Sequence, residues 1–265
     1  CHKYQMGRSD MDVRRAPSAA YMEALVIQMS DPHPLVRGSA AAAMGKLGAA
    51  AAPHAAALAS LTSDGDPIVR KHAQIALKKV GATGAEALAE RLLHSDSEAR
   101  RSAAMAMGHM GVLAAPHARA VAGRLKDGDE WVRRSAAEVL GKLGKDIVAN
   151  SGTSEADPLA KVRHLKLRDS DIAAVGPSKE CARALADSLG DSDDTVRQTA
   201  TISLGRIGPT AALHSSSLAD RLGHDSGRLT DRSSIFQRRT HETLRQMHES
   251  GFPQKNRWTP RNIMY

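Results

Sequence analysis

Basic side chains recur at two positions of a regular spacing, and they are the residues of this chain best placed for binding chemistry. The first set is Lys46, Lys79, Lys142 and Arg206, with His109 in the same register. The second set is Lys71, Arg101 and Arg134. Displayed on one face, these cations would bind an acidic protein surface, a nucleic acid or an anionic lipid. The first set also has a local explanation, because a cation in the last turn of a helix stabilises the negative end of the helix dipole by about 0.3–1 kcal/mol.

The remaining polar residues do not form the pattern of a catalytic site. His54 and His117 follow proline in two equivalent segments, which indicates a shared structural role. The two cysteines, Cys1 and Cys181, lack the spacing of a disulfide framework or a zinc site and favour reduced intracellular thiols. The sequence contains no phosphate-binding loop and no nucleophile motif. We therefore predict a non-enzymatic protein that needs no cofactor.

Five similar stretches position the basic residues. Each contains an arginine, apolar residues three, seven and ten positions later, and a glycine at the eleventh position. Apolar residues at these offsets lie on one face of a helix, and the glycine suits a left-handed cap at its end. The stretches are 36–48, 69–81, 99–111, 132–144 and 196–208, and their arginines are Arg37, Arg70, Arg100, Arg133 and Arg197.

A less regular partner helix is predicted before each stretch. These partners lie within 18–31, 53–67, 84–96, 116–130 and 178–194, and Ser18 is a suitable N-cap for the first of them. Helix pairs of about thirty residues bury their apolar faces against neighbouring pairs. Because only 3% of the residues are aromatic, alanine and small aliphatic residues must fill the core. The pattern predicts an all-α superhelix.

One interval between arginines, from position 133 to 197, is twice as long as the others. Residues 145–158 are rich in Ser, Asn, Gly and Asp and are predicted to form a loop, and Val162-Arg163 offers a weak copy of the arginine signature. We predict an array over 18–227 with a degenerate unit and an irregular insertion at about 145–160. An atypical capping repeat over 228–250 then brings the total to about seven helix pairs.

The unit D-x-x-(V/A)-R, followed by A-x-x-x-(L/M)-G-x-(L/I/V)-G, resembles the HEAT repeat, especially its short bilin-lyase-like class. The resemblance covers residues 18–250 and implies an α–α superhelix, the HEAT-repeat solenoid. It also implies that an aspartate and arginine ladder ties each turn to a neighbouring helix. The ladder residues are assigned to the five arginines and to Asp66, Asp96, Asp129 and Asp193.

Three activities known among HEAT-type proteins fit the chain less well. Deoxyhypusine hydroxylase carries His-Glu pairs directly after the repeat arginine, and none stands there in this chain, so that enzyme is excluded. HEAT-like DNA glycosylases place aromatic residues and a carboxylate on a basic face. Trp131 with Asp129 or Glu130 resembles this arrangement only weakly, and a packing role for Trp131 is favoured. Bilin-lyase-like chromophore handling is a less favoured alternative, because no pocket residues for it are identifiable.

The two ends of the chain differ from the repeats. Residues 1–17 have no periodicity and read as a leader segment, and the start at Cys1 is expected to reflect processing or an incomplete sequence. Residues 228–265 hold eight basic and three acidic residues of a chain whose net charge is +8. The extension 251–265 is basic and aromatic, and we expect it to dock on a partner rather than to be disordered. Its candidate binding residues are Phe252, Arg257, Trp258, Arg261 and Tyr265.

These features predict a non-catalytic scaffold for protein–protein interaction, an accessory subunit of a larger and perhaps organellar complex. The alternatives are a lyase-like or chaperone-like helper that binds a client transiently, and a basic nucleic-acid-binding solenoid. No apolar run reaches the length of about 18 residues that a spanning helix needs, so membrane association is expected only through a complex. An intracellular location is expected, and cytosol, mitochondrion and plastid are not distinguished.

Overall fold

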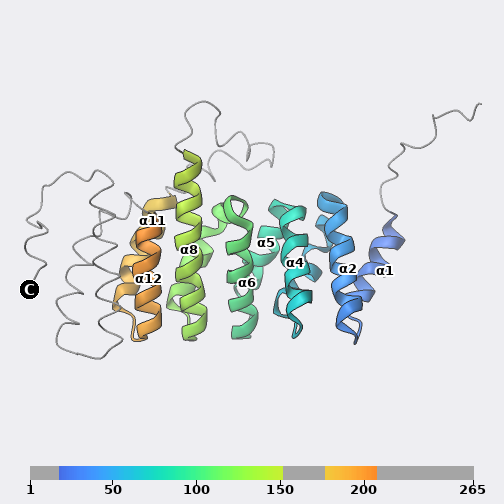
Figure 1. Ribbon diagram of the computed structural model, residues 1–265, viewed down its shortest axis with the longest axis horizontal. Helices are drawn as coiled ribbons and strands as arrows, with labels where there is room; N and C mark the ends of the chain where they lie inside the picture. The colour runs from blue at the N-terminus through green and yellow to red at the C-terminus, as the bar shows by residue number, and fades with distance from the viewer. Residues whose placement is uncertain (1–17, 152–176, 208–265) are drawn as a thin grey trace, which may run out of the picture.

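The computed structural model describes residues 18–151 and 177–207 as helices joined by short turns, and Figure 1 shows them as a row of helix pairs. The first helices of the pairs are α1 (Ala19–Gln28), α3 (Ala55–Ser60), α5 (Ala82–Arg91), α7 (Ala118–Gly123) and α11 (Pro177–Asp187). The second helices are α2 (Pro34–Leu47), α4 (Pro67–Val80), α6 (Ser97–Met110), α8 (Glu130–Ser151) and α12 (Asp194–Ile207). Short 3-10 helices flank the first helices: η1 (Gly48–His54), η2 (Leu61–Ser63), η3 (Gly111–His117), η4 (Arg124–Lys126) and η5 (Ser188–Gly190).

The pairs stack in chain order into a solenoid. Each first helix packs on the second helix that follows it, and the second helices contact one another in the order α2, α4, α6, α8 and α12. The described residues contain no strand, and the predicted all-α superhelix is confirmed. These ranges hold five helix pairs. The leader 1–17, the end of the predicted array over 208–227, the capping repeat 228–250 and the extension 251–265 lie outside the described residues.

Local sequence fixes where the helices begin and end. The Asp66 carboxylate accepts hydrogen bonds from the N–H groups of Ile68 (2.8 Å) and Val69 (3.2 Å), which caps α4. Ser18 caps α1 as predicted, its hydroxyl accepting from the N–H of Tyr21 at 3.2 Å. Gly81, which follows α4, has φ +93°, a value that favours glycine because other side chains are strained there. The glycines after α2, α4 and α6 therefore end these three helices and set the length of their repeats.

The apolar columns read from the sequence form the core. Three residues after each arginine stands an alanine that is at most 1% exposed, and seven residues after it a fully buried Met or Leu. The alanines are Ala40, Ala73, Ala103, Ala136 and Ala200, and the larger residues are Met44, Leu77, Met107, Leu140 and Leu204. The column at offset ten is buried or nearly so. Small side chains between large ones allow the helix layers to approach closely.

Glycine controls how tightly neighbouring second helices pack. A Cβ on Gly45 would lie 3.0 Å from Ala76 of the next helix, and one on Gly141 would lie 2.5 Å from the Cβ of Ser203. Gly108 occupies the same repeat position in α6, where a Cβ would lie 3.0 Å from Val139. In α4 this position holds Lys78, and α4 and α6 contact each other much less than the other neighbouring second helices do. The stack is loosest between α4 and α6.

The doubled arginine interval does not correspond to an extra unit between the helices that flank it. Helices α8 and α12 pack directly on each other, and Arg133 at the start of α8 bonds Asp191 in the turn before α12. The predicted degenerate unit therefore cannot stand between them. The loop predicted from residue 145 also begins too early. Helix α8 continues through Gly144 to Ser151, and no glycine or proline interrupts residues 145–151. The rest of the insertion, 152–176, lies outside the described residues.

Candidate functional site

The repeat arginines form a ladder of ion pairs between consecutive units. Arg37 donates from Nε and Nη2 to the two carboxylate oxygens of Asp64 at 2.7 and 2.8 Å. Arg100 binds Asp127 in the same bidentate way at 2.8 and 2.7 Å. Arg133 binds Asp191 at 2.8 and 3.0 Å, although 58 positions separate them in sequence. Parallel hydrogen bonds to a carboxylate are the strongest contacts that a guanidinium makes.

The remaining guanidinium nitrogen of each repeat arginine, Nη1, bonds the turn that precedes the arginine's own helix. Nη1 of Arg133 donates to the carbonyl oxygens of Asp127 (3.0 Å) and Gly128 (3.4 Å), in the turn before α8. The other four repeat arginines make the equivalent pair of bonds. Arg197 additionally pairs with Asp194 of its own helix. One guanidinium therefore fixes the entry of its helix and, where an aspartate follows, the position of the next unit.

The aspartates of the ladder are not the ones assigned from the sequence. Asp66, Asp96, Asp129 and Asp193 cap their own helices through backbone N–H groups. The inter-unit bonds go to the aspartates two positions earlier, Asp64, Asp127 and Asp191. The correction has a geometric reason, because the later aspartate faces its own helix N-terminus while the earlier one faces the preceding arginine. The Asp-x-Asp pattern that recurs in these turns could have indicated from the sequence that the earlier aspartate also has a role.

The ladder makes the stability of the array depend on pH. Hydrogen bonds from Arg37 lower the pKa of Asp64, and burial opposes this shift. For Asp127 and Asp191 burial is the largest effect and favours the neutral acid, but the bonds from Arg100 and Arg133 and from the backbone outweigh it, so both pKa values are lowered. Carboxylates with a depressed pKa stabilise the fold above their unfolded pKa, and this contribution is lost as pH falls through the folded value.

We expect the ladder's contribution to the free energy of unfolding to be constant at mildly acidic pH and to decrease below about pH 4, near the pKa of an unperturbed aspartate. Urea unfolding followed by circular dichroism between pH 6 and pH 2.5 measures this. Asp127→Asn removes one titrating ladder group and should reduce the slope. An unchanged slope in that variant would show that other carboxylates dominate the acid transition.

The exposed stripe of the second helices carries positions one, five and nine after the arginine. In α4 these are Lys71, Ile75 and Lys79, and in α6 they are Arg101, Met105 and His109. Ile75 and Met105 are each 44% exposed, a large fraction for apolar side chains inside a regular helix. Residues at i, i+4 and i+8 lie along one side of a helix. The adjacent helices α4 and α6 thus present two apolar side chains between two rows of basic ones; we call this the α4–α6 face.

Ile75 and Met105 were missed by the sequence reasoning, which followed the basic columns alone. Their signal was available as an apolar residue midway between two basic ones at a four-residue spacing. The corresponding residue in α8 is Glu138, which pairs with Lys142 at 2.9 Å. Position five therefore changes from apolar to acidic between α6 and α8. In α2 and α12 it holds Ala42 and Ile202, which are only partly exposed, so the exposed large apolar side chains at this position are those of α4 and α6.

The predicted basic residues differ in how far their charge is already used. Lys142 binds Glu138, which lowers the pKa of that carboxyl, and Arg101 binds Glu98 at 3.0 Å. The Arg134 guanidinium lies 5.6 Å above the ring of Trp131, which is 49% exposed. Within the described ranges, carboxylates form no ion pair with five of the predicted residues: Lys46, Lys71, Lys79, Arg134 and Arg206.

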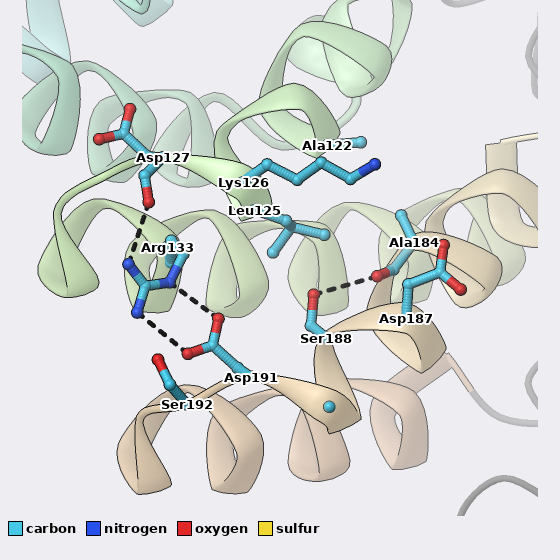
Figure 2. A pocket seen from close by; sticks show the side chains of 11 residues that line it. Ala122, Leu125, Lys126, Asp127, Arg133, Ala184, Asp187, Ser188, Asp191 and Ser192 are labelled. Carbon is cyan, nitrogen blue, oxygen red and sulfur yellow. Dashed lines mark hydrogen bonds and ion pairs between the residues drawn. The ribbon is translucent and has the colours of Figure 1, made fainter.

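A cavity of about 410 Å³ opens between the turn after α7 and the end of α11, beside the third ladder step. Figure 2 shows Arg133 between the Asp127 carbonyl and the Asp191 carboxylate, with Lys126 and Asp187 at the other side of the cavity. A second cavity of about 280 Å³ lies along the same two helices and includes Cys181, whose thiol pKa burial raises to about 12. Because its arginine and ladder aspartate bind each other, the larger cavity offers a ligand mainly Lys126, Asp187 and an apolar wall.

Two further observations concern the described residues alone. Their His, Cys, Asp and Glu side chains form no group of three or more that could hold a metal ion. None of their helices combines the length and the apolarity that crossing a bilayer requires. The five C-terminal residues predicted to bind a partner, Phe252, Arg257, Trp258, Arg261 and Tyr265, lie outside the described ranges.

We compared the chain with solved structures, curated protein sequences and protein-family models to identify its family. Solved structures similar in fold include an engineered protein (19% identity, 87% of this chain and 98% of that chain, TM-score 0.48). Another is an archaeal HEAT-like repeats protein from Thermococcus onnurineus NA1 (9% identity, 89% of this chain and 90% of that chain, TM-score 0.44). A third is the CpcE–CpcF complex of phycocyanin lyase from Nostoc sp. PCC7120 (18% identity, 91% of this chain and 99% of that chain, TM-score 0.31). No curated protein sequence matches the chain. The model of HEAT repeats matches residues 22–108 and 85–162, which together exceed half of the chain, and the chain therefore belongs to the HEAT-repeat family.

Proposed function

We propose that this protein is a non-catalytic scaffold that binds another protein on the α4–α6 face, as an accessory subunit of a larger assembly. The observation that carries the proposal is the exposure of Ile75 and Met105 between two rows of basic side chains. Apolar side chains at the centre of an interface supply affinity, and charges around them select the partner and speed association. The partner expected is an acidic amphipathic segment.

The charge distribution supports an acidic partner. Lys71 and Lys79 flank Ile75 at one helical turn on either side, and the described residues supply neither of them with a carboxylate. Lys78 adds a third exposed lysine to the same helix. An acidic segment would complete these charges while its apolar residues cover Ile75 and Met105. The ladder arginines, in contrast, have their charge matched inside the array or bonded to turn carbonyls.

The ladder supports the proposal in a second way, because it fixes the units on either side of the α4–α6 face. Arg37 ties α2 to the turn before α4, and Arg100 ties α6 to the turn before α8. Each ladder step fixes one unit on the next through side chains that are mostly shielded from water. A surface that is ordered before binding loses less conformational entropy on association. A rigid row of helices with side chains displayed at repeat spacing suits recognition of an extended partner surface.

The C-terminal extension is proposed as a second attachment. Residues 251–265 contain no acidic residue and three of the chain's seven aromatic residues, a composition suited to anchoring in a partner groove. Phe252, Trp258 and Tyr265 would be the apolar anchors, and Arg257 and Arg261 would pair with acidic groups. Assembly in an organelle is part of the same proposal and depends on the identity of the complex.

Native particle mass tests the proposal. The protein is isolated from its source under non-denaturing conditions, and the mass of the particle is measured for three forms: wild type, a form lacking 228–265, and Lys71→Glu/Lys79→Glu. We expect a particle well above the 28.2 kDa of the chain for the wild type and loss of this subunit from the particle in both variants. The double variant Lys126→Glu/Arg183→Glu carries the same charge change among the first helices and should leave the particle intact.

A free monomer in every form would contradict the scaffold proposal and favour transient binding of a client. A nucleic acid is the other alternative with an observation behind it, since Arg134 over the exposed Trp131 could stack with a base. Steep loss of RNA or DNA binding with increasing salt would support that alternative. Chromophore capture by the isolated chain would support a lyase-like role.

A further inference from the structure

The ladder has a gap at Arg70. The turn before α6 holds His94 at the position where the neighbouring turns hold Asp64, Asp127 and Asp191. Arg70 keeps the two Nη1 bonds to its own turn, to the carbonyls of Asp64 (2.6 Å) and Gly65 (2.9 Å). Its Nε and Nη2, which bind the carboxylate in the other steps, make no hydrogen bond within the described residues.

His94 replaces one function of the aspartate and not the other. Its Nδ1 accepts a hydrogen bond from the N–H of Asp96 at 3.1 Å, as a carboxylate oxygen of Asp64 accepts from the N–H of Asp66 at 2.9 Å. The turn therefore keeps its shape. An imidazole carries no negative charge, so this position offers the Arg70 guanidinium no counter-ion.

A second arginine lies at the same gap. Arg91 occupies the repeat position of Arg124, whose Nη1 lies 3.4 Å from the ladder carboxylate of Asp127. Arg91 donates to the Ser63 hydroxyl at 2.7 Å, in the same turn whose carbonyls hold Arg70. The Nε of Arg91 is buried and makes no hydrogen bond, as is also true of Arg124, so the two differ in the missing carboxylate. Burial lowers the pKa of Arg91, whereas the pKa values of the paired ladder arginines Arg100 and Arg133 are raised.

We propose that Arg70 and Arg91 form a binding site for a carboxylate, the aspartate or glutamate side chain of a partner protein, in the place that Asp127 takes one step along the ladder. The site rests on the proposed function, which it deepens by naming a second contact for an acidic partner. Two exposed apolar side chains flank it in sequence, Ile68 before Arg70 and Leu93 before His94, at 51% and 75% exposure. The site also lies where α4 and α6 pack most loosely.

Arginine side-chain NMR on the full chain tests the site without any partner. The Nε–Hε resonance of Arg70, assigned through Arg70→Lys, is followed during titration with sodium acetate, with sodium chloride at matched ionic strength as the reference. We expect a saturable shift with acetate and its loss in His94→Asp, which supplies an internal carboxylate. Asp127→His opens a second gap and should create the same response at Arg100. An acetate response equal to that of chloride, or one that persists in His94→Asp, would overturn the site.

Two further arms identify the source of the anion. Inorganic phosphate at the same ionic strength is the comparison, because a guanidinium also binds phosphate through two parallel N–H donors. A stronger shift with phosphate than with acetate would overturn the carboxylate assignment. In the native particle, His94→Asp should weaken partner retention about tenfold, the effect of losing one charge-assisted pair. Unchanged retention would overturn the assignment to a partner. A monomeric native protein would refute the scaffold while leaving the acetate result intact, so the two failures are distinguishable.

Discussion

Gly141→Ala is expected to lower the free energy of unfolding by about 2 kcal/mol. The added Cβ would lie 2.5 Å from the Cβ and 2.7 Å from the Cα of Ser203, and a backbone atom cannot move aside as a flexible side chain can. Helices α8 and α12 must then separate, which weakens the attachment of the last described unit. The loss is expected despite the better helix propensity of alanine, which by itself would stabilise by up to about 1 kcal/mol. Urea unfolding monitored by circular dichroism measures the change.

The matched control is Gly123→Ala at the end of α7. A Cβ at Gly123 meets no atom within 4 Å, so the substitution should be neutral or slightly stabilising. Hydrogen exchange adds spatial resolution, because a repeat array can lose one unit while the others stay folded. Faster exchange confined to α11 and α12 is the expected pattern in Gly141→Ala. Equal stability of the two variants would mean that α8 and α12 are not in close contact.

Asp127→Ala is expected to cost about 2 kcal/mol, between the values of exposed and fully buried ion pairs. The Asp127 side chain is 3% exposed, and its removal leaves the shielded guanidinium of Arg100 without its carboxylate. It also removes the acceptor for the N–H of Asp129. Denaturant unfolding at pH 7 gives the change, and a double-mutant cycle with Arg100→Ala isolates the coupling between the two side chains.

Asp129→Ala provides the comparison that separates the two aspartates of the turn. Asp129 caps α8 through the N–H of Val132 at 3.0 Å, so its loss should cost about 1 kcal/mol and should not couple to Arg100. His94→Asp should act in the opposite direction and stabilise the array by closing the gap at Arg70. A larger loss for Asp129→Ala than for Asp127→Ala would restore the assignment made from the sequence.

The sequence predicted what depends on local periodicity. The spacing of three, seven and ten residues after each arginine identified the buried columns, because one helix face repeats with that period. Ser18 and the glycines after α2, α4 and α6 were also correct as helix ends. Gly144 was not, because a glycine ends a helix only when the following residues stop it, and α8 continues.

The features that the sequence left undetermined depend on contacts between distant residues. Both aspartates of Asp-x-Asp directly precede the helix, so their positions in the sequence do not distinguish them. The one that binds the arginine of the preceding unit is determined by how the two units stack. The direct packing of α8 on α12 likewise joins residues on either side of the insertion, and spacing alone favoured an extra unit. The exposed pair Ile75 and Met105 belongs to a surface shared by two helices, which a search along single columns does not reveal.

Site-specific photo-crosslinking in the native source tests the proposed scaffold most directly. A photoreactive phenylalanine analogue replaces Ile75 or Met105, one at a time, and Ile27, which is 74% exposed on α1, serves as the matched position away from the α4–α6 face. We predict one discrete adduct to a second protein from positions 75 and 105, none from position 27, and loss of the adduct in Lys71→Glu/Lys79→Glu. Absence of an adduct from position 75, or the same adduct from position 27, would contradict the account.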